Sequence, residues 1–362
     1  MSREINEIMP LSNIPDWKER LARQDAFLSG KAERPVVHIV VPRAKQEPPL
    51  TERRYKTLKD RWLDPVYVAE TATWRVRNTE YLGDALPAAW PNLGPEVFSA
   101  YFGAELEYSE TTAWAVPNLH NWADADKLVF SEDNFYWKKT RELTDALLEA
   151  GKGLFYTGIT DIHPGGDAVA AFRDPLNLNM DMLDNPDELK NLLARLEKSY
   201  FELFDKMHGH LRAAGQPCSS WIGIVSSKKF YIPSNDFSCM ISPEMFNEFF
   251  LPGFIRECQH LEASIYHLDG PDAVRHLDSL LKIKELSALQ WVRGAGRSLS
   301  QHCIDIYKKC QAADKGIFLY ISSMEELEFL VENLSPRGVW LSAYLPNRLE
   351  AEAVLRRIDR WA

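Results

Sequence analysis

Residues 263–269 have the sequence ASIYHLD and are followed directly by Gly270 and Pro271. The run is apolar as far as His267, as expected for a strand that is buried on both faces. Similar runs recur along the chain, with amphipathic segments between them. The predicted strands are residues 35–41, 112–116, 153–161, 220–227, 263–269, 287–292, 316–322 and 338–344. Strands that alternate with helices pair in parallel, with the helices outside the sheet. Eight such strands predict an α/β fold of the (β/α)8 barrel (TIM barrel) type.

The helices between these strands have recognisable start signals. Asn185 is followed by a proline and two acids at the start of a long amphipathic segment, and Ser242 opens the segment after it in the same manner. No GxGxxG motif follows the first strand, which disfavours a dinucleotide-binding fold. We therefore predict an N-terminal extension over residues 1–30 and a single barrel domain over residues 31–362.

Composition narrows the class of protein. The 362 residues carry a net charge of -10, which disfavours nucleic acids and anionic membrane surfaces as partners. No apolar run approaches the roughly 20 residues that span a bilayer. The first 20 residues are charged and lack the apolar segment of a signal peptide. The five cysteines have no CxxC spacing, which predicts a reducing, cytoplasmic location and no zinc ribbon.

Candidate catalytic residues lie where predicted strands end, because a barrel enzyme builds its active site at the carboxyl ends of its strands. Asp161 and His163 lie at the end of the predicted strand 153–161, and His267 and Asp269 end the strand 263–269. His267 and Asp269 are two positions apart, so they project from the same face of that strand. We predict that these four residues form the reactive centre. Residues predicted to bind substrate lie at the ends of other strands or in the segments after them: Tyr231, Asp236, Gln290, Trp291, Arg293 and Tyr344.

Each pair also has a structural interpretation. Asp161 and His163 precede Pro-Gly-Gly, so they can form a turn closed by side-chain hydrogen bonds. His267 can be a hydrogen-bonded core histidine, with Asp269 forming a turn before Gly270. The functional interpretation is favoured because two separate strands place an acid and a histidine at the same rim. Four further histidines are expected on the surface or on helix faces: His208, His210, His260 and His276.

Several longer segments resemble the uroporphyrinogen decarboxylase-like superfamily, which includes methyltransferases acting on corrinoid proteins or coenzyme M. The segments are TGITDIHPGGDAVAAFRDPLNLNMDMLDNPDELKNLL (157–193), DFSCMISPEMFNEFFLP (236–252), YHLDG (266–270) and ALQWV (288–292). The similarity extends over roughly residues 90–345 and is specific for the superfamily rather than for one reaction. It implies a (β/α)8 barrel with the active site at the strand ends, and by analogy a homodimer.

Departures from the family patterns limit the reactions that the resemblance implies. The arginine-rich N-terminal segment that holds porphyrinogen carboxylates in true decarboxylases is reduced here to Arg43 and Lys45, and LSAYLPN replaces the late histidine motif. The chain is therefore not a typical uroporphyrinogen decarboxylase. Zinc-dependent methyltransferases of the superfamily use His-x-Cys and a second cysteine. Here Asp269 and Ser342 stand at those positions.

The resemblance implies a methyltransferase that demethylates a small substrate, with a corrinoid protein or a similar methyl carrier as its partner. The implied cofactors are zinc or another divalent metal on His267 and Asp269, and a corrinoid on the partner protein. Without a metal, His267 would act as a general acid or base that Asp269 orients.

Two alternatives stay open. A carboxy-lyase of the uroporphyrinogen decarboxylase type, acting on a carboxylated, tetrapyrrole-like substrate, predicts a basic clamp from residues such as Arg43, Lys228, Arg293 or Arg297. A barrel that binds a small ligand without turnover predicts that the acid–histidine cluster is internally satisfied.

Overall fold

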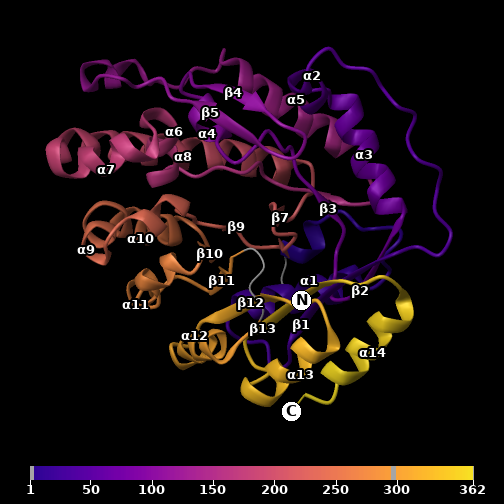
Figure 1. The fold of residues 1–362 in the computed structure, drawn as a ribbon. Helices are drawn as coiled ribbons and strands as arrows, with labels where there is room; N and C mark the ends of the chain where they lie inside the picture. The colour runs from indigo at the N-terminus through magenta and orange to yellow at the C-terminus, as the bar shows by residue number, and fades with distance from the viewer. Residues whose placement is uncertain (1–3, 295–298, 362) are drawn as a thin grey trace.

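The fold is a mixed α/β arrangement around a mostly parallel sheet (Figure 1). A computed structural model describes residues 4–294 and 299–361. Seven strands form the central sheet, and every neighbouring pair is parallel except β2 and β1. In spatial order they are β2 (Thr79–Gly83), β1 (Val36–Pro42), β13 (Val339–Tyr344), β12 (Gly316–Tyr320), β11 (Ala288–Val292), β10 (Ala263–Asp269) and β9 (Phe230–Tyr231).

The register of this sheet aligns the ends of neighbouring strands. His267 of β10 lies opposite Gln290 of β11, and Tyr320 of β12 lies opposite Ser342 of β13. The first long strand pairs with the last, from Val36 opposite Trp340 onward. Parallel strands that pair in this way bring their carboxyl ends to one edge of the sheet, and that edge carries the polar residues discussed below.

Three two-stranded sheets complete the strand inventory of the described residues. They are β3 (Ala88–Ala89) with β6 (Tyr156–Thr157), β4 (Glu105–Tyr108) with β5 (Ala113–Val116), and β7 (Cys218–Ser219) with β8 (Val225–Ser226). Backbone hydrogen bonds connect β6 to its neighbours, from Gly158 N to Ala89 O (2.8 Å) and from Ile159 N to Ser219 O (2.8 Å). The pairings define an α/β fold, and closure into an eight-stranded barrel stays a prediction.

Three predicted strands take a different form. Of the predicted strand 153–161, only Tyr156 and Thr157 are in a β-ladder, as β6. Residues 113–116 form one arm of an antiparallel hairpin, in which Ala113 and Ala115 are buried while Trp114 and Val116 are exposed. Such alternation is typical of a half-buried antiparallel strand, not of a strand covered on both faces. The predicted strand 220–227 is interrupted by a turn at residues 221–222, followed by Gly223 at φ 74°, and only Val225 and Ser226 are extended in the β8 ladder. A positive φ at this glycine cannot be part of a strand.

Helices lie around the strands (Figure 1), and the two with predicted start signals begin at Pro186 and Pro243. Their bounds are α1 (Trp17–Leu28), α2 (Leu58–Trp62), α3 (Pro65–Arg77), α4 (Val97–Ala100), α5 (Phe135–Ala150), α6 (Gly166–Arg173), α7 (Pro175–Asp184), α8 (Pro186–Ala213), α9 (Pro243–Met245), α10 (Leu251–His260), α11 (Leu277–Leu280), α12 (Gln301–Ala312), α13 (Met324–Asn333) and α14 (Arg348–Ile358). Short 3-10 turns lie at Glu4–Glu7 (η1), Trp122–Lys127 (η2), Asp236–Met240 (η3) and Asp272–His276 (η5).

Local chemistry explains how these helices begin. The Ser242 hydroxyl accepts the backbone N–H of Met245 (3.3 Å), as the predicted cap requires. The Asn185 side chain does not cap α8 and instead donates to Asp181 Oδ1 (2.9 Å). A π-helical turn, η4 (Phe246–Phe250), separates α9 from α10. Pro252 lies two residues after this turn and has no N–H for a regular helical bond, which accounts for the wider turn.

The N-terminal residues pack onto the rest of the chain. Ile5, Ile8 and Leu11 belong to a buried cluster that also contains Tyr156 of β6 and Val225 of β8. The division between residues 1–30 and 31–362 stays a prediction. Among the residues that the structure describes, no helix combines the length and apolarity that crossing a membrane requires.

Candidate active site

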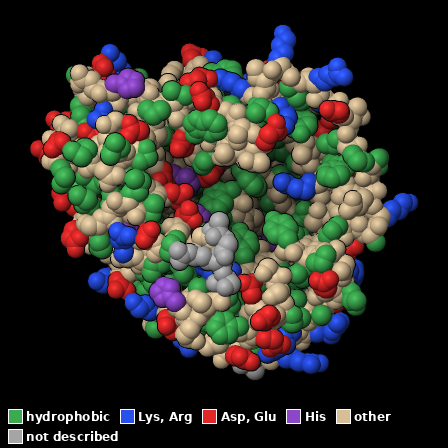
Figure 2. All heavy atoms as spheres, in the orientation of Figure 1, with side chains coloured by type: hydrophobic (Ala, Val, Ile, Leu, Met, Phe, Trp, Pro, Cys, Tyr) green, Lys and Arg blue, Asp and Glu red, His purple; other side chains and the backbone are tan. Residues whose placement is uncertain are grey.

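A cavity of about 450 Å³ lies at the carboxyl ends of the strands. Figure 2 shows a hollow near the middle of one face of the molecule, with acidic and histidine side chains beside it. The segments that follow β6 and β9 contribute to the cavity, together with strand β10, helix α6 and the turn between β7 and β8. The lining residues are Pro95, Glu96, Asp161, His163, Asp167, Ala170, Pro175, Trp221, Ser234, Asp236, Phe237, Met240 and His267.

His163 and Asp161 form the most buried polar pair of this cavity. The Nε2 atom of His163 lies 2.8 Å from Asp161 Oδ1, and His163 is only 7% exposed. Burial by itself would lower the pKa of the imidazole, but the Asp161 carboxylate, helped by Asp167 and Asp236, raises that pKa to about 9. His163 is therefore a cation at neutral pH, with a proton that it can donate.

Asp167 connects the start of α6 to the segment after β9. Its carboxylate accepts the backbone N–H groups of Asp236 (3.0 Å) and Phe237 (2.9 Å). Gly166 permits this approach, since a Cβ atom there would collide with the Asn235 side chain. Burial of the carboxyl and repulsion from Asp236 raise the pKa of Asp167 to about 7. Asp167 can therefore exchange a proton near neutral pH.

His267 lies on β10 and is oriented by its neighbours across the sheet. Its Nδ1 atom is 2.7 Å from Gln290 Oε1, and Gln290 Nε2 donates to Tyr320 Oη (3.4 Å). With the amide in this orientation, Nδ1 carries the proton and donates to Gln290. The Nε2 lone pair is then directed away from Gln290, and Nε2 lies 3.8 Å from Asp236 Oδ1. The Trp221 ring contacts the imidazole edge to face, with centroids 5.0 Å apart.

Asp269 lies two positions after His267 on β10 but does not line the cavity. Burial and repulsion from Asp236 raise the pKa of its carboxyl, while His267 lowers it. Over residues 4–294 and 299–361, no three or more His, Cys, Asp or Glu side chains form a group that could hold a metal ion. A metal on His267 and Asp269 stays a prediction.

Of the residues predicted to bind substrate, Asp236 lines the cavity, and Gln290 contacts its lining residue His267. Tyr231 is fully buried. Its hydroxyl donates to Thr160 O (2.6 Å) and accepts Ile162 N–H (2.8 Å). It therefore holds the Asp161–His163 segment in place rather than facing the cavity.

The remaining predicted residues are placed elsewhere. Trp291 donates from Nε1 to Gly270 O (3.0 Å) and so fixes the turn after β10. Arg293 pairs with Glu326 (3.4 Å). Tyr344 is 79% exposed at the end of β13. The structure does not bring these three side chains into the lining of the cavity.

The cavity residues that the sequence-based assignment missed include Glu96, Asp167 and Trp221. Trp221 was hidden because its segment resembled a continuous strand, whereas it lies in the turn between β7 and β8. The Gly-Gly-Asp sequence at the start of α6 was a usable signal for Asp167, since glycines at a helix start allow close approach. Glu96 accepts the backbone N–H of Ala115 from the β4–β5 hairpin, and Glu96 itself lies outside every predicted strand.

The other histidines are placed mostly as expected. His210 is exposed and pairs with Asp145 (2.7 Å), and His208 and His260 lie partly exposed on helices. His276 departs from the prediction because it is only 1% exposed. Its ring stacks on Phe246, and its Nε2 is 2.8 Å from Ser238 O.

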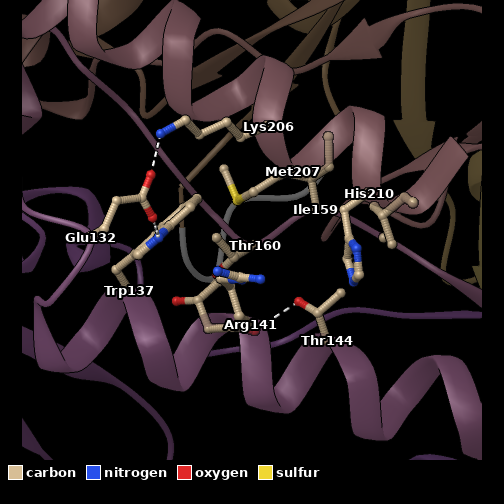
Figure 3. A pocket seen from close by; sticks show the side chains of 12 residues that line it. Glu132, Trp137, Arg141, Thr144, Ile159, Thr160, Lys206, Met207 and His210 are labelled. Carbon is tan, nitrogen blue, oxygen red and sulfur yellow. Dashed lines mark hydrogen bonds and ion pairs between the residues drawn. The ribbon is translucent and has the colours of Figure 1, made fainter. Parts of the chain in front are cut away.

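A second cavity, of about 240 Å³, lies between α5 and α8 (Figure 3). Two of its charged side chains pair with each other, whereas Arg141 has no hydrogen bond or ion pair among the described residues. Lys206 pairs with Glu132, which also accepts from Trp137 Nε1 (2.7 Å). None of the predicted site residues lines this cavity. The predicted site residues that line a cavity therefore lie at the first one.

No family model matches this chain, and no curated protein matches it. Its function is therefore argued from the geometry of the cavity.

Proposed function

We propose that this protein is a methyltransferase of the uroporphyrinogen decarboxylase-like superfamily, which demethylates a small substrate with a corrinoid protein or a similar carrier as the methyl acceptor. One observation carries this proposal. The described residues that line the cavity include two histidines and four carboxylates, with no lysine or arginine. Such a cavity can hold and protonate a leaving group, but it offers no clamp for substrate carboxylates.

The proposal includes a closed (β/α)8 barrel. The parallel pairing of β1 with β13 supports closure, because it joins the first and last long strands. The backbone hydrogen bonds that link β3, β6 and β7 support the remaining part of the ring. A barrel places the cavity where enzymes of this architecture have their active sites.

In this proposal, His163 supplies the proton when an ether is demethylated. The methyl group leaves with neither electron of its C–O bond, and the oxygen that keeps the pair takes the proton. The carrier supplies the electron pair that attacks the methyl carbon. Asp161 holds the imidazolium in position, and the Asp167 carboxyl can restore its proton. When the leaving group is an amine released from an ammonium, no proton is needed, and His163 serves to bind the substrate.

A divalent metal, if bound, would act as a Lewis acid on the leaving group. His267 Nε2 and Asp236 Oδ1 are the described donors nearest to such an arrangement. Because the described residues do not supply a third ligand in place, no step of this mechanism depends on a metal.

The carboxy-lyase is the less supported alternative. Lys228 donates to the Ser29 hydroxyl (2.7 Å), and Arg293 pairs with Glu326, so neither is available to the cavity. Arg43 is absent from the lining residues, and Arg297 lies outside the described residues. A clamp for several carboxylates therefore has no support among the described residues.

The test is methyl transfer from a panel of methylated ethers and amines to cob(I)alamin, followed by the absorbance of the methylated product. We expect turnover by the wild type, and a loss of roughly 100-fold or more in kcat/KM for His163→Gln. His210→Gln is the matched control, because it removes an exposed histidine outside the cavity. Release of CO₂ from a carboxylated tetrapyrrole, with no methyl transfer, would establish the lyase instead.

Elemental analysis of the wild type, His267→Ala and Asp269→Asn proteins tests the metal separately. Near-stoichiometric metal that is lost in both variants would make β10 a ligand strand. Metal-free protein that transfers methyl groups at full rate would exclude a metal role.

A further inference from the structure

The cavity contains more carboxylate groups than positively charged side chains. Glu96, Asp161, Asp167 and Asp236 all line it, and the positive side chain facing them is His163. The arginine nearest in sequence, Arg173 at the end of α6, is used by Asp181 (2.7 Å). Burial raises the pKa of both Asp167 and Asp269, and repulsion from the Asp236 carboxylate raises it further. A cationic ligand would relieve this repulsion.

The walls of the cavity favour an organic cation over a metal ion. Trp221, Phe237 and Met240 provide aromatic and apolar surface beside the carboxylates. Aromatic faces attract methylated ammonium groups through their negative potential. A volume of about 450 Å³ is far larger than a bare ion requires, and the described residues contain no three-ligand metal group.

A second observation specifies another part of the ligand. His163 is 7% exposed, its Nε2 faces Asp161, and its Nδ1 has no hydrogen-bond partner in the described chain. Buried polar groups are nearly always hydrogen-bonded, so an unpartnered imidazolium N–H in a cavity wall calls for an acceptor on the ligand. The acceptor that fits a donor of this kind is a hydroxyl, ether or carboxylate oxygen.

We infer that the substrate is a small N-methylated ammonium compound that also carries an oxygen acceptor, as in an amino alcohol or an amino acid. The ammonium lies against Trp221 and near Asp236, and the oxygen accepts from His163 Nδ1. This inference rests on the proposed function for its chemistry. The methyl carbon passes to the carrier's two-electron nucleophile, the electron pair of the C–N bond stays on nitrogen, and a neutral amine leaves.

Calorimetric titration of the full chain tests the inference with four small probes and two metals. The probes are choline, glycine betaine, tetramethylammonium, and 3,3-dimethylbutan-1-ol, the uncharged carbon analogue of choline. We expect choline or glycine betaine to bind at least ten times more tightly than the uncharged analogue, and more tightly than tetramethylammonium, which lacks the oxygen. Magnesium and zinc chlorides are titrated alone and in competition.

Variants locate the binding site. Trp221→Leu and Asp236→Asn are expected to weaken binding of the best probe at least threefold, and Asp236→Glu, which keeps the charge, should restore much of it. The control Asp278→Asn removes one exposed charge outside the cavity and should leave the affinity unchanged. Melting temperatures of all variants are compared, so that a folding defect is recognised.

Three results would overturn the inference: equal binding of the uncharged analogue, no binding of any ammonium probe, or a stoichiometric metal that competes with the ammonium probes. Ammonium binding without methyl transfer would support this cavity assignment and contradict the proposed methyltransferase. Methyl transfer from a neutral ether without ammonium binding would do the opposite.

Discussion

Buried acids in two regions of this protein have opposite surroundings. Asp84, just after β2, is 1% exposed and pairs with Arg23 and with Arg34 (3.0 Å), while its second oxygen accepts Val37 N–H (3.0 Å). Asp167, in the cavity, has backbone donors but no arginine or lysine, and burial raises its pKa to about 7. An acid that the chain itself neutralises is structural, whereas one left without a cation is free to exchange a proton or to meet a ligand.

Asp25 shows that hydroxyl groups can also serve as partners. It accepts from Ser226 (2.6 Å) and Ser227 (2.5 Å), and these bonds tie α1 to the residues of β8 and just after it. Burial raises the pKa of this carboxyl, and the serine bonds oppose the rise. The N-terminal helix is therefore attached by polar as well as apolar contacts, at a distance from the cavity lining.

Removing Asp84, whose charge two arginines neutralise, should have the largest effect on stability. Asp84→Ala leaves Val37 N–H without its partner and two arginines without theirs. We expect a loss of about 3 kcal/mol in the free energy of unfolding, because a buried ion pair is broken from one side. Urea denaturation followed by circular dichroism measures it. A loss below about 1 kcal/mol would show that the arginines do not depend on Asp84.

Removing a buried acid that no arginine or lysine of the described residues neutralises should instead stabilise the folded protein. Glu257 on α10 is 3% exposed, and burial raises its pKa to about 8, although His163 acts to lower it. The folded state thus binds this proton more tightly than the unfolded state, whose pKa lies near 4.5. Its stability contribution is complete below about pH 4.5 and is lost as the pH rises through about 8.

Glu257→Gln is therefore expected to stabilise the protein at pH 9, by on the order of 2 kcal/mol, and to change little at pH 4. Denaturation curves at the two pH values supply the comparison. The control is Glu248→Gln on the neighbouring η4, because Glu248 forms an exposed pair with Lys190 that contributes little. Destabilisation at both pH values would mean that the Glu257 carboxylate makes a bond that the fold needs.

The smallest effect on stability is expected at Gln290, whose hydrogen bond orients the His267 side chain. Gln290→Leu removes the acceptor of His267 Nδ1–H, at a cost of about 1 kcal/mol. The more informative result is the tautomer, which ¹⁵N chemical shifts of the imidazole report. We expect mostly the Nδ1–H form in the wild type and a mixture in the variant. An unchanged tautomer would show that Gln290 does not set it.

Local sequence features predicted much of the fold. The apolar runs at 35–41 and 338–344 correspond to β1 and β13, and the start signal at Asn185 matches the start of α8 at Pro186. Segments that mix apolar residues with glycine and serine were predicted less well. Residues 220–227 could not be divided from sequence alone, since only the backbone conformation at Gly223 shows that the strand stops there.

The ends of the predicted strands indicated where the site lies. They did not indicate which side chains form hydrogen bonds or ion pairs with other parts of the protein. They located Asp161, His163 and His267, which the structure brings to one cavity, together with Asp236 from the loop after β9. They could not reveal that Tyr231 and Trp291 make supporting hydrogen bonds, or that Arg293 has an acidic partner. Partner choice depends on distances between residues far apart in the chain.

The sequence by itself determined the alternation of buried strands and amphipathic helices, because apolar spacing and helix caps are properties of neighbouring residues. It also placed acids and histidines after strands that share one edge. Only the tertiary structure decided which charges are neutralised. Asp84 meets two arginines, whereas Asp167 and Asp236 meet each other, and this difference arises from contacts between distant segments that no local pattern records.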